Sequence, residues 1–293
     1  MDLMIHSSSF LLPSTSAGDD HRRSLTYALV LLNQRLPKFT PLLWEHEQHK
    51  FEFAPMEEPI GSMTICLFSS QTKTPPMFAA GIRIVAFKAL QQRRGISICF
   101  NAYCICLLRE NLWFKPDVIK GDMDSVRSEV LNFYSDLGTD VVDESDDQDT
   151  TDLHKCIAYI NGVMPNLDKS SFCILVTGAL GGRFDHEAGN INVLHRFSTT
   201  RITLLSDDCL IYLLPKTHRH EIHVNFSAEG PHCGLVPMGM PSRRTTTTGL
   251  QWDLNDAEMR FGGLVSTSNI VKAEKVTVES DADLLWTISI KKF

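Results

Sequence analysis

Two acidic clusters lie in one stretch of the chain, and their side chains are of the kind that binds a hard cation. The first cluster is Asp122 and Asp124, directly after an apolar run that ends in Gly121. The second includes Asp149 and Asp152, at the start of a predicted helix. Proteins hold Mg²⁺ with one or two carboxylates and leave its other positions to water and phosphate oxygens. The clusters therefore indicate a magnesium–phosphate site, although a solvated acidic loop is the commoner meaning of a charge run.

One amphipathic helix is predicted between the two clusters. Apolar residues recur there at the helical period, with a serine before them and a glycine after them. They are Val126, Val130, Phe133, Tyr134 and Leu137. The clusters thus fall on the loops that flank one helix. Because clustered carboxylates repel one another, a shared metal ion gives them a reason to lie together.

A glycine-rich turn offers a second kind of chemistry. It includes Gly181, Gly182, Arg183 and Asp185, and it joins the apolar run 172–178 to a predicted helix. Free backbone N–H groups at a helix start favour anions. The glycine spacing matches neither the P-loop nor the dinucleotide fingerprint. Two interpretations stay open here, a phosphate contact and an Arg–Asp pair that only shapes the turn.

Trp252 offers a third kind of chemistry, on what the pattern predicts to be a short strand. The face of a tryptophan ring attracts a cationic heteroaromatic ring. The commoner role of a strand tryptophan is packing in a sheet. Polar residues follow it at Ser266, Ser268 and Asn269, which could supply hydrogen bonds to the same ligand.

Five segments resemble motifs of the eukaryotic thiamine pyrophosphokinase family. They are GDMDS at 121–125, DQDTTD at 147–152, TGALGGRFDH at 177–186, TTTGLQWDL at 246–254 and LVSTSN at 264–269. The resemblance covers about 24–45 and 115–293. It implies Mg²⁺-dependent transfer of pyrophosphate from ATP to thiamine, giving thiamine diphosphate and AMP. It also implies a homodimer with the active site at the subunit interface.

The resemblance assigns roles residue by residue. The catalytic and metal-binding residues are expected to be Asp122, Asp124 and Asp152. The thiamine-binding residues are expected to be Gln148, Trp252, Ser266, Ser268 and Asn269. The nucleotide-binding residues are expected to be Gly181, Gly182, Arg183, Asp185, Asp149 and Thr151.

The interval 47–114 departs from the family. It contains Pro55, Pro59, Pro75 and Pro76 and half of the eight cysteines, and no apolar period persists in it. It also lacks the family's Ala-Asp-Gly-Gly motif, whose aspartate belongs to the metal and phosphate site. We therefore expect it to pack poorly against the sheet and to be the least ordered part of the chain. A catalytically impaired thiamine- or nucleotide-binding relative, from mis-splicing or a wrong gene model, is one alternative; another phosphotransferase on the same fold is a second.

The order of predicted elements gives the fold class. Strands alternate with helices over 24–214, which predicts an open, mostly parallel α/β sheet of Rossmann-like type that binds the nucleotide. Short alternating strands over 215–293 predict a β-sandwich that binds thiamine. Residues 1–23 are expected to be a disordered tail.

Composition narrows the class of protein. The net charge of −7 argues against nucleic acid as a partner, since such sites need a basic stripe. No apolar run is long enough to span a membrane. The eight cysteines lack zinc-ligand spacing and are expected to be reduced thiols. We expect a cytosolic enzyme that needs no membrane.

Overall fold

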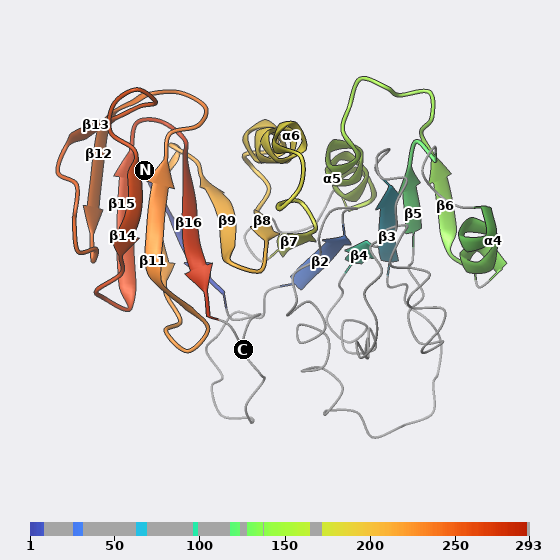
Figure 1. Ribbon diagram of the computed structural model, residues 1–293, viewed down its shortest axis with the longest axis horizontal. Coiled ribbons are helices and arrows are strands. Elements are labelled where there is room, and N and C mark those ends of the chain that lie inside the picture. The colour runs from blue at the N-terminus through green and yellow to red at the C-terminus, as the bar shows by residue number, and fades with distance from the viewer. Residues whose placement is uncertain are drawn as a thin grey trace. The chain divides into compact units, whose positions relative to one another are not determined.

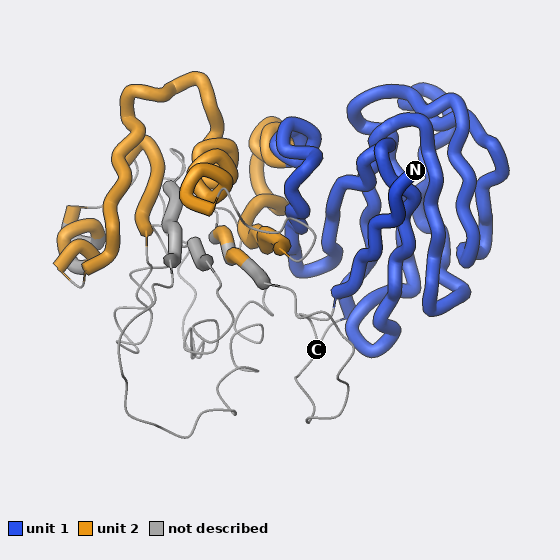
Figure 2. The backbone as a smooth tube through the Cα atoms, turned by 180° about the vertical axis from the view of Figure 1, so that it is seen from behind, with its two compact units in different colours: residues 1–12, 191–293 blue, residues 13–190 orange. Residues whose placement is uncertain are grey.

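The chain forms two compact units. The computed structural model describes residues 1–8, 26–31, 63–68, 96–98, 118–123, 128–136, 138–164 and 172–291. Residues 13–190 form one unit, here called the N-terminal unit, and residues 1–12 with 191–293 form the C-terminal unit (Figure 2). The division falls within one helix, whereas the sequence pattern put the domain boundary at 214. A sheet-rich fold in two parts, as predicted, is confirmed.

The described residues of the N-terminal unit form six parallel strands. They are β2 (Thr26–Leu31), β3 (Met63–Phe68), β4 (Ile96–Ile98), β5 (Val118–Gly121), β6 (Asp140–Asp143) and β7 (Phe172–Thr177). Their order is β7-β2-β4-β3-β5-β6, and all neighbours in it pair parallel (Figure 1). The carboxyl ends of parallel strands share one edge of a sheet. The loops that follow β5, β6 and β7 therefore leave from the same edge.

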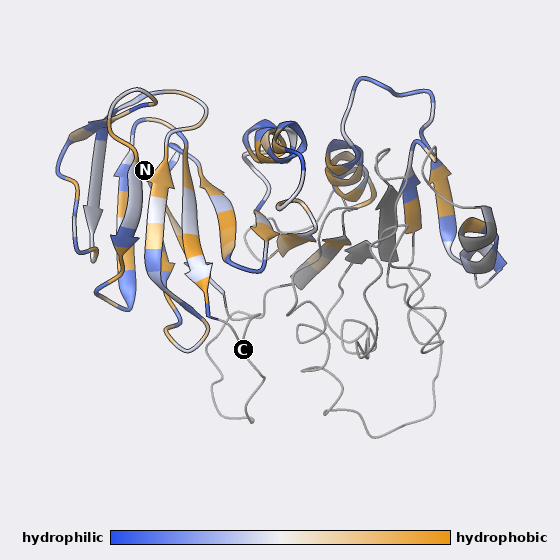
Figure 3. Cartoon of the chain, in the orientation of Figure 1, coloured by the Kyte–Doolittle hydropathy of each residue, from blue (hydrophilic) through white to orange (hydrophobic). Residues whose placement is uncertain are grey.

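Apolar strand interiors and one-sided helices explain these elements. All residues of β7 and β5 are buried, as expected of strands covered on both faces. Helix α4 (Ser128–Asp136) connects β5 to β6, and α5 (Asp152–Val163) follows β6. Helix α5 packs on β3 and β5 and buries Leu153, Cys156, Ile157 and Ile160, which recur at helical spacing. The loop between β6 and α5 is mostly hydrophilic (Figure 3).

The interval 47–114 contributes two strands to this sheet. β3 pairs with β5 from Ile65 opposite Val118 to Phe68 opposite Gly121, and β4 pairs with β2. The expectation of poor packing against the sheet is therefore wrong at these two strands. A run as short as ISI (96–98) is long enough to pair in a parallel sheet but too short to show a period. The expectation of low order elsewhere in the interval falls outside the described residues.

The C-terminal unit contains two sheets. Its strands are β1 (Asp2–Ser7), β8 (Ile202–Leu205), β9 (Cys209–Leu214), β10 (His218–His223), β11 (Glu229–Val236), β12 (Ser242–Thr248), β13 (Ala257–Met259), β14 (Ser266–Ile270), β15 (Lys275–Ser280) and β16 (Leu284–Ile290). One sheet has the order β1-β10-β15-β12-β13, and the other has β8-β9-β16-β11-β14. Helix α6 (Phe184–Arg196) contains the division between the units. Strands β8 and β9, predicted as part of the α/β domain, group with the C-terminal unit.

The first residues of the chain form a strand and not a disordered tail. β1 pairs parallel with β10, so the expected tail is wrong for residues 2–7, and residues 9–23 lie outside the described residues. The His6 ring stacks on Tyr212 of the other sheet, with 4.8 Å between ring centroids. The Ser8 hydroxyl donates to the buried carboxylate of Glu229 at 2.6 Å. These contacts hold a short N-terminal strand that the sequence pattern alone does not distinguish from a tail.

In the part of the chain that the structure describes, no helix is both long and apolar enough to cross a membrane.

Candidate active site

The first acidic cluster follows β5 directly and is tied to the end of β6. The Glu144 N–H donates to the Gly121 carbonyl at 2.8 Å, which joins the two strand ends. Asp122 comes next and is half-buried, and Met123 then adopts a left-handed backbone with φ of 58°. Such a conformation costs a non-glycine residue on the order of 1 kcal/mol. The chain thus turns away from the strand direction at the metal candidate. Asp124 lies outside the described residues.

Ser145 brings Asp122 and Gln148 together. Its hydroxyl lies 2.7 Å from the Asp122 carbonyl oxygen and within hydrogen-bond distance of the Asp143 carboxylate, so its one proton serves either acceptor. The Gln148 side chain donates to the Ser145 carbonyl at 2.9 Å. Hydrogen bonds from the Ser145 hydroxyl and N–H lower the pKa of Asp143. Sequence reasoning missed Ser145, although Asp-x-Ser is a common turn pattern.

Asp147 organises the second acidic cluster. Its carboxylate accepts hydrogen bonds from the N–H groups of Asp149 at 2.9 Å and Thr150 at 3.2 Å, and from the Thr150 hydroxyl. The Thr150 hydroxyl is the main cause of the lowered pKa of Asp147. The buried Lys155 ammonium donates to the Asp147 carbonyl at 2.6 Å. Asp147 therefore shapes the loop on which Asp149 is presented.

Thr151 and Asp152 begin helix α5. The Thr151 hydroxyl accepts from the His154 N–H at 3.3 Å, which is an N-cap bond. Asp152 is the first residue of the helix and is half-buried. A carboxylate in this position is stabilised by the positive end of the helix dipole. Because α5 begins in the loop that follows β6, Thr151 and Asp152 both lie at the carboxyl edge of the sheet.

A buried lysine lies beneath this edge. Lys120, on β5, has a side chain that is 2% exposed, and its ammonium forms an ion pair with Glu144. The same ammonium lies 5.0 Å from the centroid of the Tyr159 ring on α5. Lys120 therefore links β5, the acidic loop and α5. Its position on a strand pattern gave no sign of this role.

Two of the three predicted metal-binding carboxylates, Asp122 and Asp152, lie among the described residues. Among the described residues no group of three or more His, Cys, Asp or Glu side chains is arranged to hold a metal ion. Asp122 and Asp152 remain as described carboxylate candidates at the sheet edge, with Asp124 predicted beside them. Mg²⁺ is commonly held by one or two carboxylates together with substrate phosphates and water. Carboxylates are thus of the ligand type that Mg²⁺ takes, and magnesium binding stays a prediction here.

The glycine-rich turn is held from within the chain. Strand β7 leads into Gly178, with φ of 72°, and then Gly181, with φ of 92°, both in the left-handed region open to glycine. The N–H groups of Gly181 and Gly182 both donate to the same oxygen of Glu187 at 2.9 Å. The backbone donors that were predicted to approach phosphate are thus bound to an internal carboxylate.

Arg183 and Asp185 form an exposed ion pair in this turn. Arg183 Nε donates to Asp185 Oδ1 at 3.0 Å, and a second guanidinium nitrogen contacts the other carboxylate oxygen. These hydrogen bonds lower the pKa of Asp185 and raise that of Arg183. The pair is present in the turn, and the phosphate contact stays a prediction. A surface pair of this kind exchanges readily with another anion, since it contributes only about 0–1 kcal/mol.

Helix α6 lies against the start of α5. A Cβ added to Gly189 would lie 3.6 Å from Thr151 Cγ2. A side chain at Gly189 would thus begin in ordinary van der Waals contact with the cap residue. The structure thus brings Thr151 to the helix that carries Asp185.

Trp252 lies in a turn and not on the predicted strand. The turn joins β12 to β13, and at Gly249, with φ of 92°, a Cβ would lie 2.6 Å from the Lys275 carbonyl oxygen. The Asp253 carboxylate closes the turn by accepting from the Thr247 hydroxyl at 3.0 Å and from the Leu250 N–H at 3.1 Å. Polar and glycine residues therefore outweigh the β propensity of the tryptophan here.

Asn269 holds Trp252 at the surface of the C-terminal unit. The Trp252 side chain is 56% exposed, whereas Asn269 is buried. The Asn269 amide bonds to both the N–H and the carbonyl of Trp252 and donates to the Ser266 hydroxyl at 3.3 Å. Ser268 is exposed, with φ of 56°. The structure thus joins Trp252, Ser266 and Asn269, three of the four predicted thiamine-binding residues that lie in the C-terminal unit.

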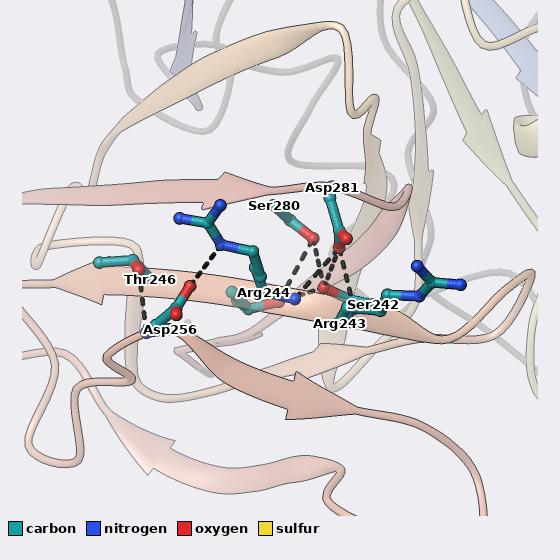
Figure 4. Close-up of polar contacts among 8 residues, drawn as sticks. Ser242, Arg243, Arg244, Thr246, Asp256, Ser280 and Asp281 are labelled. Carbon is teal, nitrogen blue, oxygen red and sulfur yellow. Dashed lines mark hydrogen bonds and ion pairs between the residues drawn. The ribbon is translucent and has the colours of Figure 1, made fainter.

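The strand that leads to this turn is anchored at its first residues. Asp281 accepts from the buried Ser242 hydroxyl at 2.8 Å and from the Arg243 N–H at 2.9 Å, while Arg244 Nε donates to Asp256 at 2.6 Å (Figure 4). Burial acts to raise the pKa of Asp281, but these hydrogen bonds outweigh it and lower the pKa. The bonds to Asp281 tie β12 to the end of β15, and the Arg244–Asp256 bond ties β12 to the residue before β13.

Comparison with known proteins decides the family. A family model described as "Thiamin pyrophosphokinase, catalytic domain" matches residues 84–205, and one described as "Thiamin pyrophosphokinase, vitamin B1 binding domain" matches residues 219–285. Thiamine pyrophosphokinase 1 of Arabidopsis thaliana is 56% identical over 295 residues, covering 100% of this chain and 95% of the relative. The chain belongs to the thiamin pyrophosphokinase family.

Other thiamin pyrophosphokinases extend the likeness. Thiamine pyrophosphokinase 1 of Oryza sativa is 51% identical over 294 residues, covering 98% of each chain. The yeast thiamin pyrophosphokinase structure has a TM-score of 0.64 at 18% identity and covers 99% of this chain and 91% of its own. The structure from Candida albicans has a TM-score of 0.59 at 22% identity, covering 80% and 95%. These two structures show the shared fold.

The matches also bear on the anomalous interval and on the alternatives. The catalytic-domain match of the thiamin pyrophosphokinase family begins at residue 84, so residues 47–83 lie outside it and 84–114 lie within it. The boundary predicted at 214 falls between the two matched ranges. The comparisons give no support to an impaired relative or to a different phosphotransferase, since the curated relatives reported above are all named thiamine pyrophosphokinases.

Proposed function

We propose that this chain transfers the β,γ-pyrophosphoryl group of ATP to the hydroxyl of thiamine, giving thiamine diphosphate and AMP. The hydroxyl oxygen attacks the β-phosphorus, a new O–P bond forms, and the bond from that phosphorus to the bridging oxygen of AMP breaks. The hydroxyl proton passes to a carboxylate at the sheet edge. The observation that carries the proposal is the meeting of Asp122 and Gln148 at Ser145, where β5 and β6 end.

The acidic residues give the carboxyl edge of the parallel sheet a negative charge that favours a bound cation. Asp122, Asp124 and Asp152 would hold Mg²⁺, which when bound neutralises phosphate oxygens. Hydrogen bonds lower the pKa values of Asp143 and Asp147, so both neighbours stay ionised at neutral pH. Their negative charges would attract the cation to this edge. Gln148, whose side chain donates to the Ser145 carbonyl, would orient the thiamine hydroxyl.

The six parallel strands support the nucleotide part of the proposal. We assign them as a Rossmann-like sheet, in which ligands bind beyond the carboxyl ends of the strands. Arg183, Asp185, Asp149 and Thr151 all follow such strand ends and would contact ATP, with Gly181 and Gly182 allowing close approach. Arg183 would exchange its surface bond to Asp185 for phosphate oxygens, because charge-assisted bonds to phosphate are stronger.

The C-terminal unit supports the thiamine part. We assign its two sheets as a β-sandwich whose exposed Trp252 stacks on the cationic thiazolium ring, with Ser266, Ser268 and Asn269 around it. We also propose a homodimer, which rests on the resemblance that places this tryptophan across a subunit interface. A cytosolic setting is proposed from the free thiols of Cys156, Cys173, Cys209 and Cys233.

The test is an assay of the purified full chain with thiamine, ATP and Mg²⁺. Chromatography should show thiamine diphosphate and AMP in equal amounts, and EDTA should stop both. ADP as the nucleotide product would overturn the reaction type, and no thiamine product would overturn the function. Light scattering on the same sample measures the subunit number.

A further inference from the structure

Two side chains of α6 hold the glycine-rich turn. Glu187 and Asn190 are three residues apart and so lie on one face of the helix. One Glu187 oxygen accepts from the N–H groups of Gly181 and Gly182, both at 2.9 Å. The buried Asn190 amide donates to the Ala179 carbonyl at 3.0 Å. Helix α6 therefore holds the turn at two points, through the N–H groups of Gly181 and Gly182 and through the Ala179 carbonyl.

The contacts decide between two roles for Glu187. A phosphate that took the N–H groups of Gly181 and Gly182 would lie at the carboxylate, and two anions at one site repel strongly. The carboxylate would also have to leave the positive end of α6, which stabilises it. Retaining Glu187 on the turn meets neither cost. The N–H groups of Gly181 and Gly182 then stay bonded to Glu187, and ATP contacts other atoms of the turn.

From this we propose that Glu187 is a positioning residue for ATP, which it serves by presetting the glycine-rich turn through the N–H groups of Gly181 and Gly182. The proposal rests on the proposed function in that ATP is the ligand of the turn. Asn190 supports the same conformation from the next turn of the helix. Glycines with left-handed backbone are otherwise free to adopt many conformations, so a preset turn saves ordering entropy when the nucleotide binds.

The test compares Glu187→Ala, which removes the acceptor, with Glu187→Gln, which keeps one side-chain oxygen for both N–H groups. Glu187→Ala should raise the KM for ATP about tenfold, the scale of one or two hydrogen bonds, with kcat and the KM for thiamine within about twofold of the starting protein. Glu187→Gln should restore the KM. Asn192→Ala, on an exposed position of the same helix, is the matched control.

Hydrogen exchange gives a readout that does not need turnover. The peptide covering 178–187 should exchange faster in Glu187→Ala and at the original rate in Glu187→Gln, and calorimetry with ATP should show the same order of affinity. An unchanged ATP affinity in Glu187→Ala would overturn the proposal. Tighter ATP binding in that variant would show a carboxylate that competes with phosphate, and equal damage by glutamine would show a role for charge alone; each overturns it. If the full chain made no thiamine diphosphate, the proposed function would fail while these two measurements still decided the role of Glu187.

Discussion

Asn269 holds the peptide groups on both sides of Trp252. Its side-chain oxygen accepts from the Trp252 N–H at 3.2 Å, and its amide nitrogen donates to the Trp252 carbonyl at 2.9 Å. The same oxygen accepts from the Ile270 N–H at 2.8 Å, and the second amide hydrogen goes to Ser266. An amide side chain has two donor and two acceptor positions, and all four are used. Asn269 is thus suited to fixing the backbone at Trp252, whose side chain is 56% exposed.

We expect Trp252→Ala to weaken thiamine binding by about 1–2 kcal/mol through the lost cation–π contact. Because the side chain is 56% exposed, its removal should change the free energy of unfolding little. Calorimetry with thiamine and with ATP checks this. Equal losses for both ligands, or a large drop in melting temperature, would contradict a stacking role.

We expect Asn269→Asp to weaken thiamine binding while ATP binding stays unchanged. Aspartate keeps the acceptor oxygens for Trp252 and Ile270 but loses the donors to the Trp252 carbonyl and Ser266, at a stability cost of about 1–3 kcal/mol. Urea unfolding and thiamine calorimetry measure the two effects. Gln251→Ala, an exposed neighbour, is the control and should change neither. Full thiamine affinity in Asn269→Asp would show that the hydrogen bonds from Asn269 to Trp252 do not contribute to thiamine binding.

Sequence patterns predicted much of the fold, because every residue of a buried strand such as FCILVT (172–177) is apolar or small enough to be buried. They failed where long-range pairing decides. β4 is three residues long, and β1 is stabilised by His6 and Ser8 contacts to distant residues. The site followed the same division. Asp122, Gln148 and Trp252 were predicted from their types and motifs and stay predictions. Two side chains that hold the predicted loops show only in three dimensions, namely Ser145 at Asp122 and Gln148, and Glu187 at the glycine-rich turn.

We expect Asp122→Asn and Asp152→Asn each to lower AMP formation about a hundredfold or more at saturating Mg²⁺, because a neutral amide is a poor ligand for a hard cation. Both residues are half-buried in loop or helix-start positions, so a native melting curve is expected for both. Asp146→Asn, exposed in the same loop, is the matched control and should retain activity. Full turnover in the two variants would make the metal assignment wrong.

We expect Lys120→Met to lower the free energy of unfolding by about 2–3 kcal/mol, since it leaves Glu144 without its buried partner. Adding Glu144→Gln should recover part of this loss, because the unpaired charge is then removed. Urea unfolding of both single variants and the double variant gives the coupling energy. A double variant no better than the sum of the singles would show that the pair contributes nothing.

His6 and His220 share a hydrogen bond that ties β1 to β10. Their Nε2 and Nδ1 atoms lie 3.0 Å apart, and His220 Nε2 donates to the Pro215 carbonyl at 2.9 Å. The neutral His220 ring therefore accepts at Nδ1, and His6 donates. Burial lowers the pKa of His6 well below its usual range, with His220, Arg201 and His218 adding to the shift. Burial also lowers the pKa of His220 to about 4, aided by His218 and Arg201 and opposed by the Pro215 hydrogen bond and Asp283.

We expect the C-terminal unit to lose stability as the pH falls from about 6.5 toward 4, the window in which the unfolded chain binds these protons and the folded chain does not. His220 alone should account for about 2 kcal/mol by pH 5. Urea unfolding at pH 7 and pH 5, with hydrogen exchange of residues 2–7, measures the loss and its place at β1. The double variant His6→Phe/His220→Gln should flatten the pH dependence, whereas His232→Gln, an exposed histidine, should not. A pH dependence that survives in the double variant would assign it to other groups.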